Sequence, residues 1–294
     1  MVSAAAGLGV SQAFRTFAFG LEVTADEERH VALRQREIEM VLRPLFAIEH
    51  TFVGGSFARR TAVKPVRAAD LFVELGPAER TYLMRRPSAL IRAFGNALAP
   101  CLGGLEEGPG HLAIDFARGR RQPVSRINLR PTFVHHDGWS IPDTNANSWR
   151  ITDLGRHAQL AEDCANRMPG RWRSLVQMMK CWNMAQSPMP IQPAFLIEVT
   201  ALECLKPPLG AFDHEVYGFF ELLGQRLSAP WLDPAGSGAL VREALRGDEL
   251  RRAQQAVRMG QARARSAITS AGLGDARGAL ESWRTLFGSQ FPLD

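Results

Sequence analysis

Lysine is almost missing from this chain of 294 residues, in which only Lys64, Lys180 and Lys206 occur and arginine carries the remaining positive charge. Cysteine is also scarce, because the chain has four cysteines that lie far apart and form no CxxC pair. That spacing argues against a disulfide scaffold or a zinc ribbon and fits a reducing compartment. We therefore expect a cytoplasmic protein.

Long apolar runs are absent as well. No uninterrupted stretch approaches the roughly 20 residues that span a bilayer, and residues 1–9 lack the basic start of a signal peptide. No segment recurs with a period of about 20–50 residues, so a solenoid is excluded. The sequence predicts neither a membrane partner nor a repeat protein.

The remaining composition is that of an ordinary globular protein. Hydrophobic residues make up 46% of the chain and charged residues 22%, which excludes wholesale disorder. The length suits one large α/β unit or two lobes. The net charge is +5, and basic residues gather at 59–67 and at 118–130. Such clusters suit phosphate or form a solvated basic face.

The hydrophobic pattern predicts a mixed, largely antiparallel sheet in the first half of the chain and a helical second half. A helix is expected from Thr24 to His50, with Thr24 as its N-cap, and Pro44 should kink it or end it early. Other expected elements are strands at 52–53, 71–75, 111–116 and 126–134, a Gly-rich loop at 103–110, a basic connection at 118–122, a loop at 135–147, and helices at 78–98, 157–166, 172–183, 193–205, 213–227 and through most of 238–287.

The segment from Val53 to Leu75 carries the strongest chemical signal. A strand that ends in Gly54-Gly55-Ser56 and turns into a short helix exposes backbone N–H groups to an oxyanion. A basic link then leads to a strand that carries Asp70. This is the layout of polymerase-β-type nucleotidyltransferases, in which two acids at i and i+2 and a third from a neighbouring strand hold two divalent ions.

The order of these residues resembles a known family. Gly55 and Ser56, then Arg59 and Thr61, then residues 67–71 are similar to the GS turn, the R-x-T stretch and the D-x-D strand of the cGAS/DncV-like nucleotidyltransferases, or CD-NTases. These proteins are bacterial relatives of animal cGAS and of oligoadenylate synthases. The resemblance continues in order through residues 127–133, 141–153, 175–183, 195–198 and 283–292, and so covers nearly the whole chain.

The resemblance implies a bilobal α+β fold. Residues 1–150 would form a nucleotidyltransferase lobe with an N-terminal spine helix, and residues 151–294 a helical lobe that closes the nucleotide cleft. It also implies synthesis of a cyclic oligonucleotide from NTPs such as ATP and GTP, with Mg²⁺ or Mn²⁺, in CBASS-type antiphage signalling with an effector or regulatory protein. The nucleotide-binding residues it implies are Gly55, Ser56, Arg59 and Lys180, with Asp70 as a metal ligand.

Two of the three acid positions depart from the family pattern. Ala68 stands at the first acid of the D-x-D pair and Asn128 at the third, so that Asp70 alone remains. One carboxylate cannot hold two hard cations that each require several oxygen ligands. Glu74 lies about 13 Å from Asp70 along the strand, and Asp115 lies on the adjacent strand in an unknown register. We therefore expect impaired catalysis.

Two explanations for the lost acids stay open. The chain is either a natural pseudoenzyme that acts as a nucleotide sensor or an interaction scaffold, or a chain inactivated on purpose. Asp at positions 68 and 128 would restore the family pattern. Ala194, where the family often has a phosphate-contacting serine, and Arg60, in place of the glycine of R-G-T, depart further from it.

Three other features have structural explanations that we favour. His135, His136 and Asp137 lie together, but adjacent histidines on a strand point to opposite faces, so a metal site is not expected. Cys181 is expected to be a buried structural cysteine. The arginines between 246 and 265 are predicted to form a solvated helix face, so that no nucleic-acid partner is expected.

Overall fold

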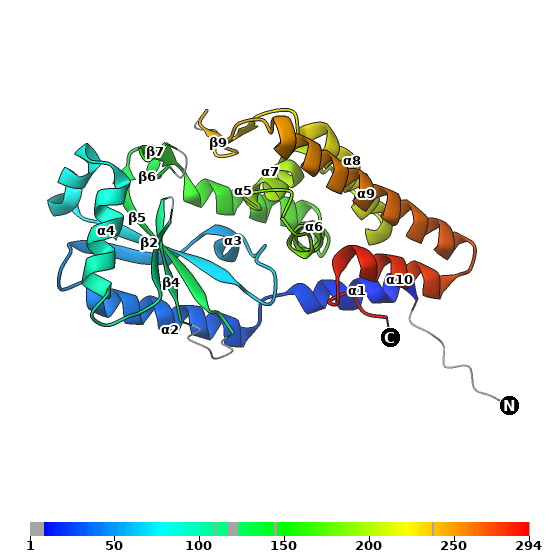
Figure 1. Ribbon diagram of the computed structural model, residues 1–294, viewed down its shortest axis with the longest axis horizontal. Coiled ribbons are helices and arrows are strands. Elements are labelled where there is room, and N and C mark those ends of the chain that lie inside the picture. The colour runs from blue at the N-terminus through cyan, green and yellow to red at the C-terminus, as the bar shows by residue number, and fades with distance from the viewer. Residues whose placement is uncertain (1–8, 109, 117–122, 144–145, 237, 294) are drawn as a thin grey trace. The chain divides into compact units, whose positions relative to one another are not determined.

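The computed structural model describes residues 9–108, 110–116, 123–143, 146–236 and 238–293 (Figure 1). The chain divides into two compact units. The sheet unit comprises Val23–Leu160 and Asp233–Ala239, and the helical unit comprises Met1–Glu22, Ala161–Leu232 and Leu240–Asp294. The predicted basic connection at 118–122 lies outside the described residues.

Within the described residues, the sheet unit contains one sheet of seven strands, in the order β1-β2-β5-β4-β3, with β6 paired to β5 and β7 paired to β6. β2 and β5 are parallel, whereas the other pairs are antiparallel, as the sequence predicted. The strands are β1 (Ile48–Val53), β2 (Ala68–Leu75), β3 (Leu105–Gly108), β4 (His111–Asp115), β5 (Arg126–His135), β6 (Gly138–Pro142) and β7 (Trp149–Thr152).

The two faces of this sheet differ in polarity because side chains alternate along each strand. One face buries Leu71 and Val73 of β2 and Leu129 of β5 in a core with helices α2 (Ala25–Leu42) and α4 (Pro87–Leu98) (Figure 1). The opposite face carries Asp70 and Asn128, which are cross-strand neighbours in the β2–β5 register. The apolar face therefore fixes the strands that present the polar one.

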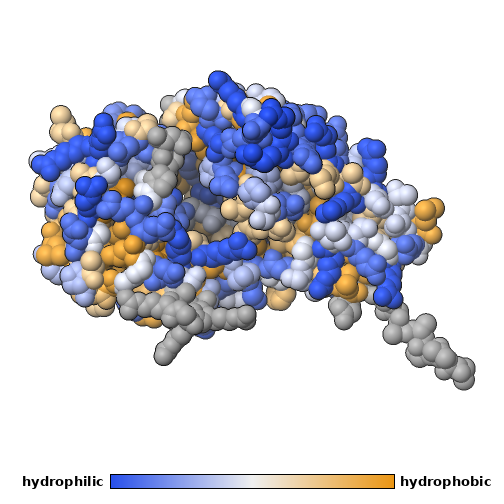
Figure 2. All heavy atoms as spheres, in the orientation of Figure 1, coloured by the Kyte–Doolittle hydropathy of each residue, from blue (hydrophilic) through white to orange (hydrophobic). Residues whose placement is uncertain are grey.

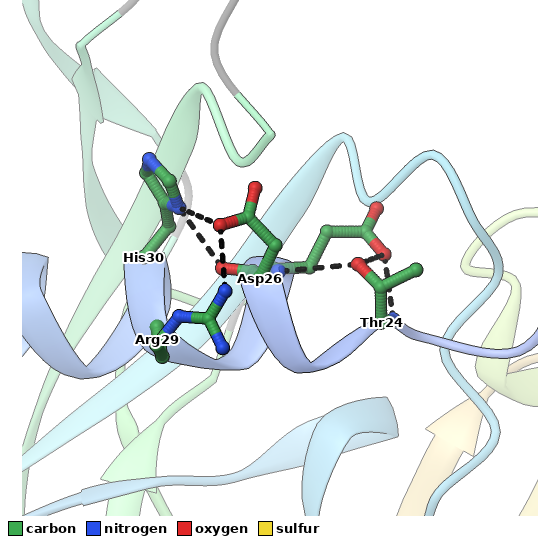
Figure 3. Close-up of polar contacts among 5 residues, drawn as sticks. Thr24, Asp26, Arg29 and His30 are labelled. Carbon is green, nitrogen blue, oxygen red and sulfur yellow. Dashed lines mark hydrogen bonds and ion pairs between the residues drawn. The ribbon is translucent and has the colours of Figure 1, made fainter.

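Helix α2 begins where the sequence predicted. The Thr24 side chain accepts from the Glu27 backbone N–H, and the Glu27 carboxylate accepts from the Thr24 backbone N–H, which completes a capping box (Figure 3). The helix ends at Leu42, just before Pro44. The predicted helix to His50 is therefore too long, and its last residues belong to β1.

Four further elements differ from the prediction. The helix predicted at 78–98 is divided into a 3-10 helix, η1 (Pro77–Met84), and α4, because Pro87 begins a new helix with its fixed φ. Strand β3 occupies the predicted Gly-rich loop, and β6 occupies the predicted loop at 135–147. Both are short strands that pair with a sequence neighbour, β4 and β5 respectively. Helix α1 (Val10–Leu21) was not predicted.

The helical unit buries a cluster of aromatic rings. Phe14 and Phe17 of α1 pack against Trp283, Phe287 and Phe291, with ring centroids 4.8–5.2 Å apart in the tightest pairs. The unit's other elements are α6 (Trp172–Ala185), α7 (Phe195–Cys204), α8 (Phe212–Arg226), β8 (Trp231–Leu232), β9 (Leu240–Arg242), α9 (Gly247–Gly272) and α10 (Ala276–Phe287). Helix α5 (Leu154–Arg167) contributes residues to both units.

The described part of the chain contains neither a membrane-spanning helix nor a disulfide. None of its helices has both the length and the apolarity that crossing a bilayer demands. All four cysteines are free thiols, and Cys164 and Cys181 are buried, which confirms the expected burial of Cys181.

Candidate functional site

The turn after β1 is built on two glycines that approach β2 closely. Gly55 has φ +60°, and a Cβ atom there would lie 2.5 Å from Oδ2 of Asp70. A Cβ atom on Gly54 would lie 2.4 Å from the Phe72 ring, and the Gly54 N–H donates to the Asp70 carbonyl at 2.9 Å. Both positions therefore require glycine, and the turn holds its backbone against the Asp70 side chain.

The short helix α3 (Gly55–Ala58) continues into a tight loop. The Ser56 carbonyl accepts from the N–H groups of Thr61 (2.8 Å) and Ala62 (3.1 Å). No described residue forms a hydrogen bond with the Ser56 hydroxyl, which stays available to a ligand. Arg60 has φ +56°, a left-handed conformation that explains why glycine suits the family pattern at this position.

The carboxylate of Asp70 is engaged by two side chains of β5. Asn128 Nδ2 donates to Oδ1 of Asp70 at 3.3 Å, and Arg130 Nε donates to the same oxygen at 3.1 Å. Arg130 also donates through Nη1 to the Gly110 carbonyl at 3.3 Å. Ala68 lies two residues before Asp70 and thus on the same face, opposite Arg126 in the register. The site contains one acid, an amide, a methyl group and a guanidinium.

These contacts set the charge state of Asp70. Burial on its own raises the pKa of the Asp70 carboxyl. The charge and hydrogen bond of Arg130, together with the Asn128 amide, lower it by more. Arg59, which is buried nearby, lowers it further, so the pKa of Asp70 lies below its ordinary value. Asp70 is therefore a carboxylate balanced by protein cations.

This donor set does not fit a pair of divalent ions. Oδ1 of Asp70 already accepts from two side chains, and neither nearby acid supplies what is missing. Glu74 is buried, and its Oε2 accepts from Trp139 Nε1 at 3.1 Å. Asp115 shares the polar face but lies on β4, two strands and about 10 Å from β2. We therefore derive no chemistry through metal ions at Asp70.

Lys180 lies in the helical unit, in a buried ion pair. Its Nζ is 2.5 Å from Oε1 of Glu198, and the two side chains are 7% and 1% exposed. Gly55, Ser56 and Asp70, by contrast, lie together in the sheet unit. The contribution of Lys180 to a shared nucleotide site stays a prediction.

The cluster of His135, His136 and Asp137 is more compact than expected. One ligand atom from each residue lies within 4.8 Å of the others, which makes this the one group among the described residues that could hold a metal ion. β5 ends at His135, and His136 lies in the following turn, so the expected opposite orientation of the two rings is wrong. Their ring centroids are 4.0 Å apart. His135 Nδ1, however, accepts from the Asp137 N–H at 3.1 Å.

A second polar cluster was not predicted. His157, expected only to begin a helix, is buried, and its Nε2 lies 2.5 Å from Oδ1 of Asp233. The Thr152 hydroxyl donates to the other oxygen of Asp233 at 2.6 Å. Burial raises the pKa of Asp233, but these hydrogen bonds lower it more strongly, to about 2. Because 76 residues separate His157 from Asp233, no local pattern could reveal the contact.

Comparison by sequence finds cyclic-nucleotide synthases. No protein-family model matches the chain. It is 23% identical over 262 residues to the cyclic AMP-AMP-AMP synthase of Acinetobacter sp. (strain ATCC 27244 / 9458), with 83% of this chain and 73% of the relative covered. It is 23% identical over 281 residues to a probable cyclic nucleotide synthase of Bacillus cereus (strain VD146), with 84% of each covered.

Comparison by structure finds the same group. The chain is similar to CdnC of E. coli MS115-1 with ATP, at a TM-score of 0.71 and 18% identity, with 95% of this chain and 98% of the other covered. It is also similar to CdnC in the CdnC:HORMA-deltaN complex, at a TM-score of 0.69, 18% identity and coverage of 96% and 98%. These findings confirm the resemblance to CD-NTases and the predicted α+β nucleotidyltransferase fold.

Proposed function

We propose that this chain, which has the fold of the CD-NTases, binds nucleoside triphosphates but does not join them at the rate of a cyclic-oligonucleotide synthase. The observation that carries the proposal is the state of Asp70. It stands without an acid at position 68 or 128 and accepts from Arg130 at 3.1 Å. The names of the relatives support nucleotides as the ligand class.

Synthesis by this family's chemistry requires attack of a hydroxyl group on an α-phosphorus and release of pyrophosphate. Two closely spaced divalent ions normally stabilise the attacking and leaving oxygens in such displacements. In this chain a guanidinium occupies the surroundings of the surviving carboxylate. A guanidinium balances charge and donates hydrogen bonds, but unlike a metal ion it cannot coordinate the oxygen of the attacking hydroxyl group. The residues present therefore support binding better than synthesis.

The proposed ligand is an NTP such as ATP or GTP. The half-buried hydroxyl of Ser56 and the backbone N–H of Gly55 would donate to phosphate oxygens, next to the basic residues 59–67. Replacing two carboxylates by uncharged residues removes repulsion of the triphosphate. Two like charges about 4 Å apart repel by about 4 kcal/mol at an effective dielectric of 20, and salt reduces this value. Binding should therefore not need a metal ion.

We also propose a regulatory protein as partner and a role in bacterial antiphage signalling. The CdnC neighbour forms a complex with a HORMA protein, which supports a regulatory protein as partner here. We place the chain in the cytoplasm and in CBASS-type antiphage signalling, as a nucleotide sensor or an interaction scaffold. The free, widely spaced cysteines support the cytoplasm, and the family resemblance and the loss of the acids support the signalling role.

Incubation of the purified chain with labelled NTPs and either Mg²⁺ or Mn²⁺ tests the proposal. The variant Ala68→Asp/Asn128→Asp serves as the comparison, and Ala68→Asp alone as the control, because it restores only one acid. We expect no product from the chain itself. Product from the double variant alone would support loss of synthesis through the two acids and would favour deliberate or recent inactivation. Product from the unaltered chain at the rate of the double variant would overturn the proposal.

A further inference from the structure

A pocket of about 380 Å³ lies within the helical unit. It is lined by the loop of residues 186–192 after α6, by one face of α9, by Arg242 of β9 and by Leu286 of α10. All of its lining belongs to the helical unit, so the pocket does not depend on the glycine turn or on Asp70. Its volume lies within the range of small-molecule sites, which is about 300–1,000 Å³.

The residues that α9 contributes share one face of the helix. Arg252, Ala256, Met259 and Arg263 follow one another at spacings of four, three and four residues, and all line the pocket. Met259 is 48% exposed, and Met189 from the facing loop is 38% exposed. Methionine side chains adapt to irregular apolar ligands. Trp182, Pro188, Pro190 and Leu286 complete the apolar part of the lining.

Three arginines line the pocket, and two of them, Arg252 and Arg263, give it a net positive charge. Arg242 donates to Glu249 at 2.5 Å and to the Gln192 carbonyl at 2.6 Å, so it neutralises Glu249, the one acid in the lining. No described carboxylate forms an ion pair with Arg252 or Arg263.

The sequence of α9 strengthens this charge. Residues 250–274 contain five arginines and no acid. Figure 2 shows strongly hydrophilic side chains over the region where Figure 1 places β9 and the start of α9. The two acids of α9, Asp248 and Glu249, pair with Arg251 and Arg242. Arg252 and Arg263 therefore lie on two sides of the apolar surface without an ion-pair partner among the described carboxylates.

We infer that this pocket binds an organic anion that carries a carboxylate or a phosphate on an apolar or aromatic body. A guanidinium matches the two oxygens of a carboxylate or phosphate and stacks on flat rings. Gln186 and Gln255 in the lining can donate to the same oxygens. The apolar floor holds the body of the ligand, and Arg252 and Arg263, about 16 Å apart along α9, are the two cations available to its charge. This binding is independent of the nucleotide function proposed above.

A dye titration tests the inference. 8-Anilino-1-naphthalenesulfonate has an aromatic body and one anionic group, and its fluorescence rises on binding. We expect saturable binding of one dye per chain and at least a fivefold weaker Kd for Arg252→Gln/Arg263→Gln. Arg258→Gln is the matched control, because Arg258 lies on α9 outside this pocket. Its Kd should equal that of the unaltered chain, and circular dichroism should show that all variants are folded.

Competition then assigns the anionic group. Displacement of the dye by phenyl phosphate points to a phosphate ligand, and displacement by 4-phenylbutyrate points to a carboxylate ligand. The inference is overturned if neither compound displaces the dye. It is also overturned if the double variant binds the dye as tightly as the unaltered chain, or if the control loses affinity to the same extent.

Discussion

Arg130 donates its Nε–H to Oδ1 of Asp70 at 3.1 Å, from a position two residues beyond Asn128 on the adjacent parallel strand. The contact places a permanent positive charge beside the one acid that remains at this site. It explains why Asp70 stays ionised without a metal ion. It also means that restoring acids at 68 and 128 changes the charge of a site that is balanced as it stands.

Gly55 should tolerate no side chain. In Gly55→Ala the new Cβ would lie 2.5 Å from Asp70 Oδ2, in a left-handed conformation. We expect a loss of about 1–3 kcal/mol in the free energy of unfolding and at least a tenfold loss of NTP affinity. Urea unfolding and calorimetry measure the two effects. Gly218→Ala is the control, because nothing lies within 4 Å of its added Cβ. Equal stability of Gly55→Ala and the unaltered chain would contradict the geometry.

Arg60 should be strained by its left-handed backbone. The φ of Arg60 is +56°, a conformation that only glycine adopts without cost. We therefore expect Arg60→Gly to have a free energy of unfolding about 0.5–1 kcal/mol higher than that of Arg60→Ala. Both variants lose the same guanidinium, so their difference isolates the backbone. The prediction fails if the alanine variant is the more stable of the two.

Removing only one partner of the buried Lys180–Glu198 ion pair should destabilise the fold more than removing both. Lys180→Met leaves the Glu198 carboxylate buried without the positive charge of Lys180, which should cost about 3–5 kcal/mol of stability. Lys180→Met/Glu198→Leu should recover a large part of that loss, because no charge stays buried. Thermal unfolding of the two variants measures this. A double variant less stable than Lys180→Met would show that the ion pair is not the cause.

Asp233 should make stability depend on acid pH. Its folded-state pKa of about 2 lies below its ordinary value, so its contribution is complete above about pH 4 and is lost as the pH falls toward 2. Asp233→Asn should therefore lower the free energy of unfolding by about 2 kcal/mol at pH 6 and by much less at pH 2.5. Asp137→Asn, at an exposed acid, is the control. An equal loss at both pH values would exclude this linkage.

The parts of the fold that depend on local chemistry were predictable. Thr24 caps α2 because its neighbours within one turn supply the capping box, and Pro44 marks where the helix must end. The two-residue alternation of β2 places Asp70 on the polar face. Gly55 is fixed by a turn whose glycine pattern is visible in the sequence.

The parts that depend on distant partners were not predictable. β3 and β6 are strands only because β4 and β5 supply their hydrogen bonds. Arg130 belonged to a cluster predicted to meet phosphate or solvent, and only the parallel register of β5 against β2 places it on Asp70. Its alternation with Asn128 along one strand was the one available signal.

Calorimetric titration of the folded chain with ATP, in the presence of Mg²⁺ and again with EDTA, tests the central claim most directly. The account predicts a measurable Kd that changes less than threefold when the metal is removed and that rises with salt, because protein cations bind the triphosphate. Binding that weakens more than tenfold in EDTA would contradict the account. The absence of binding under both conditions would contradict it as well.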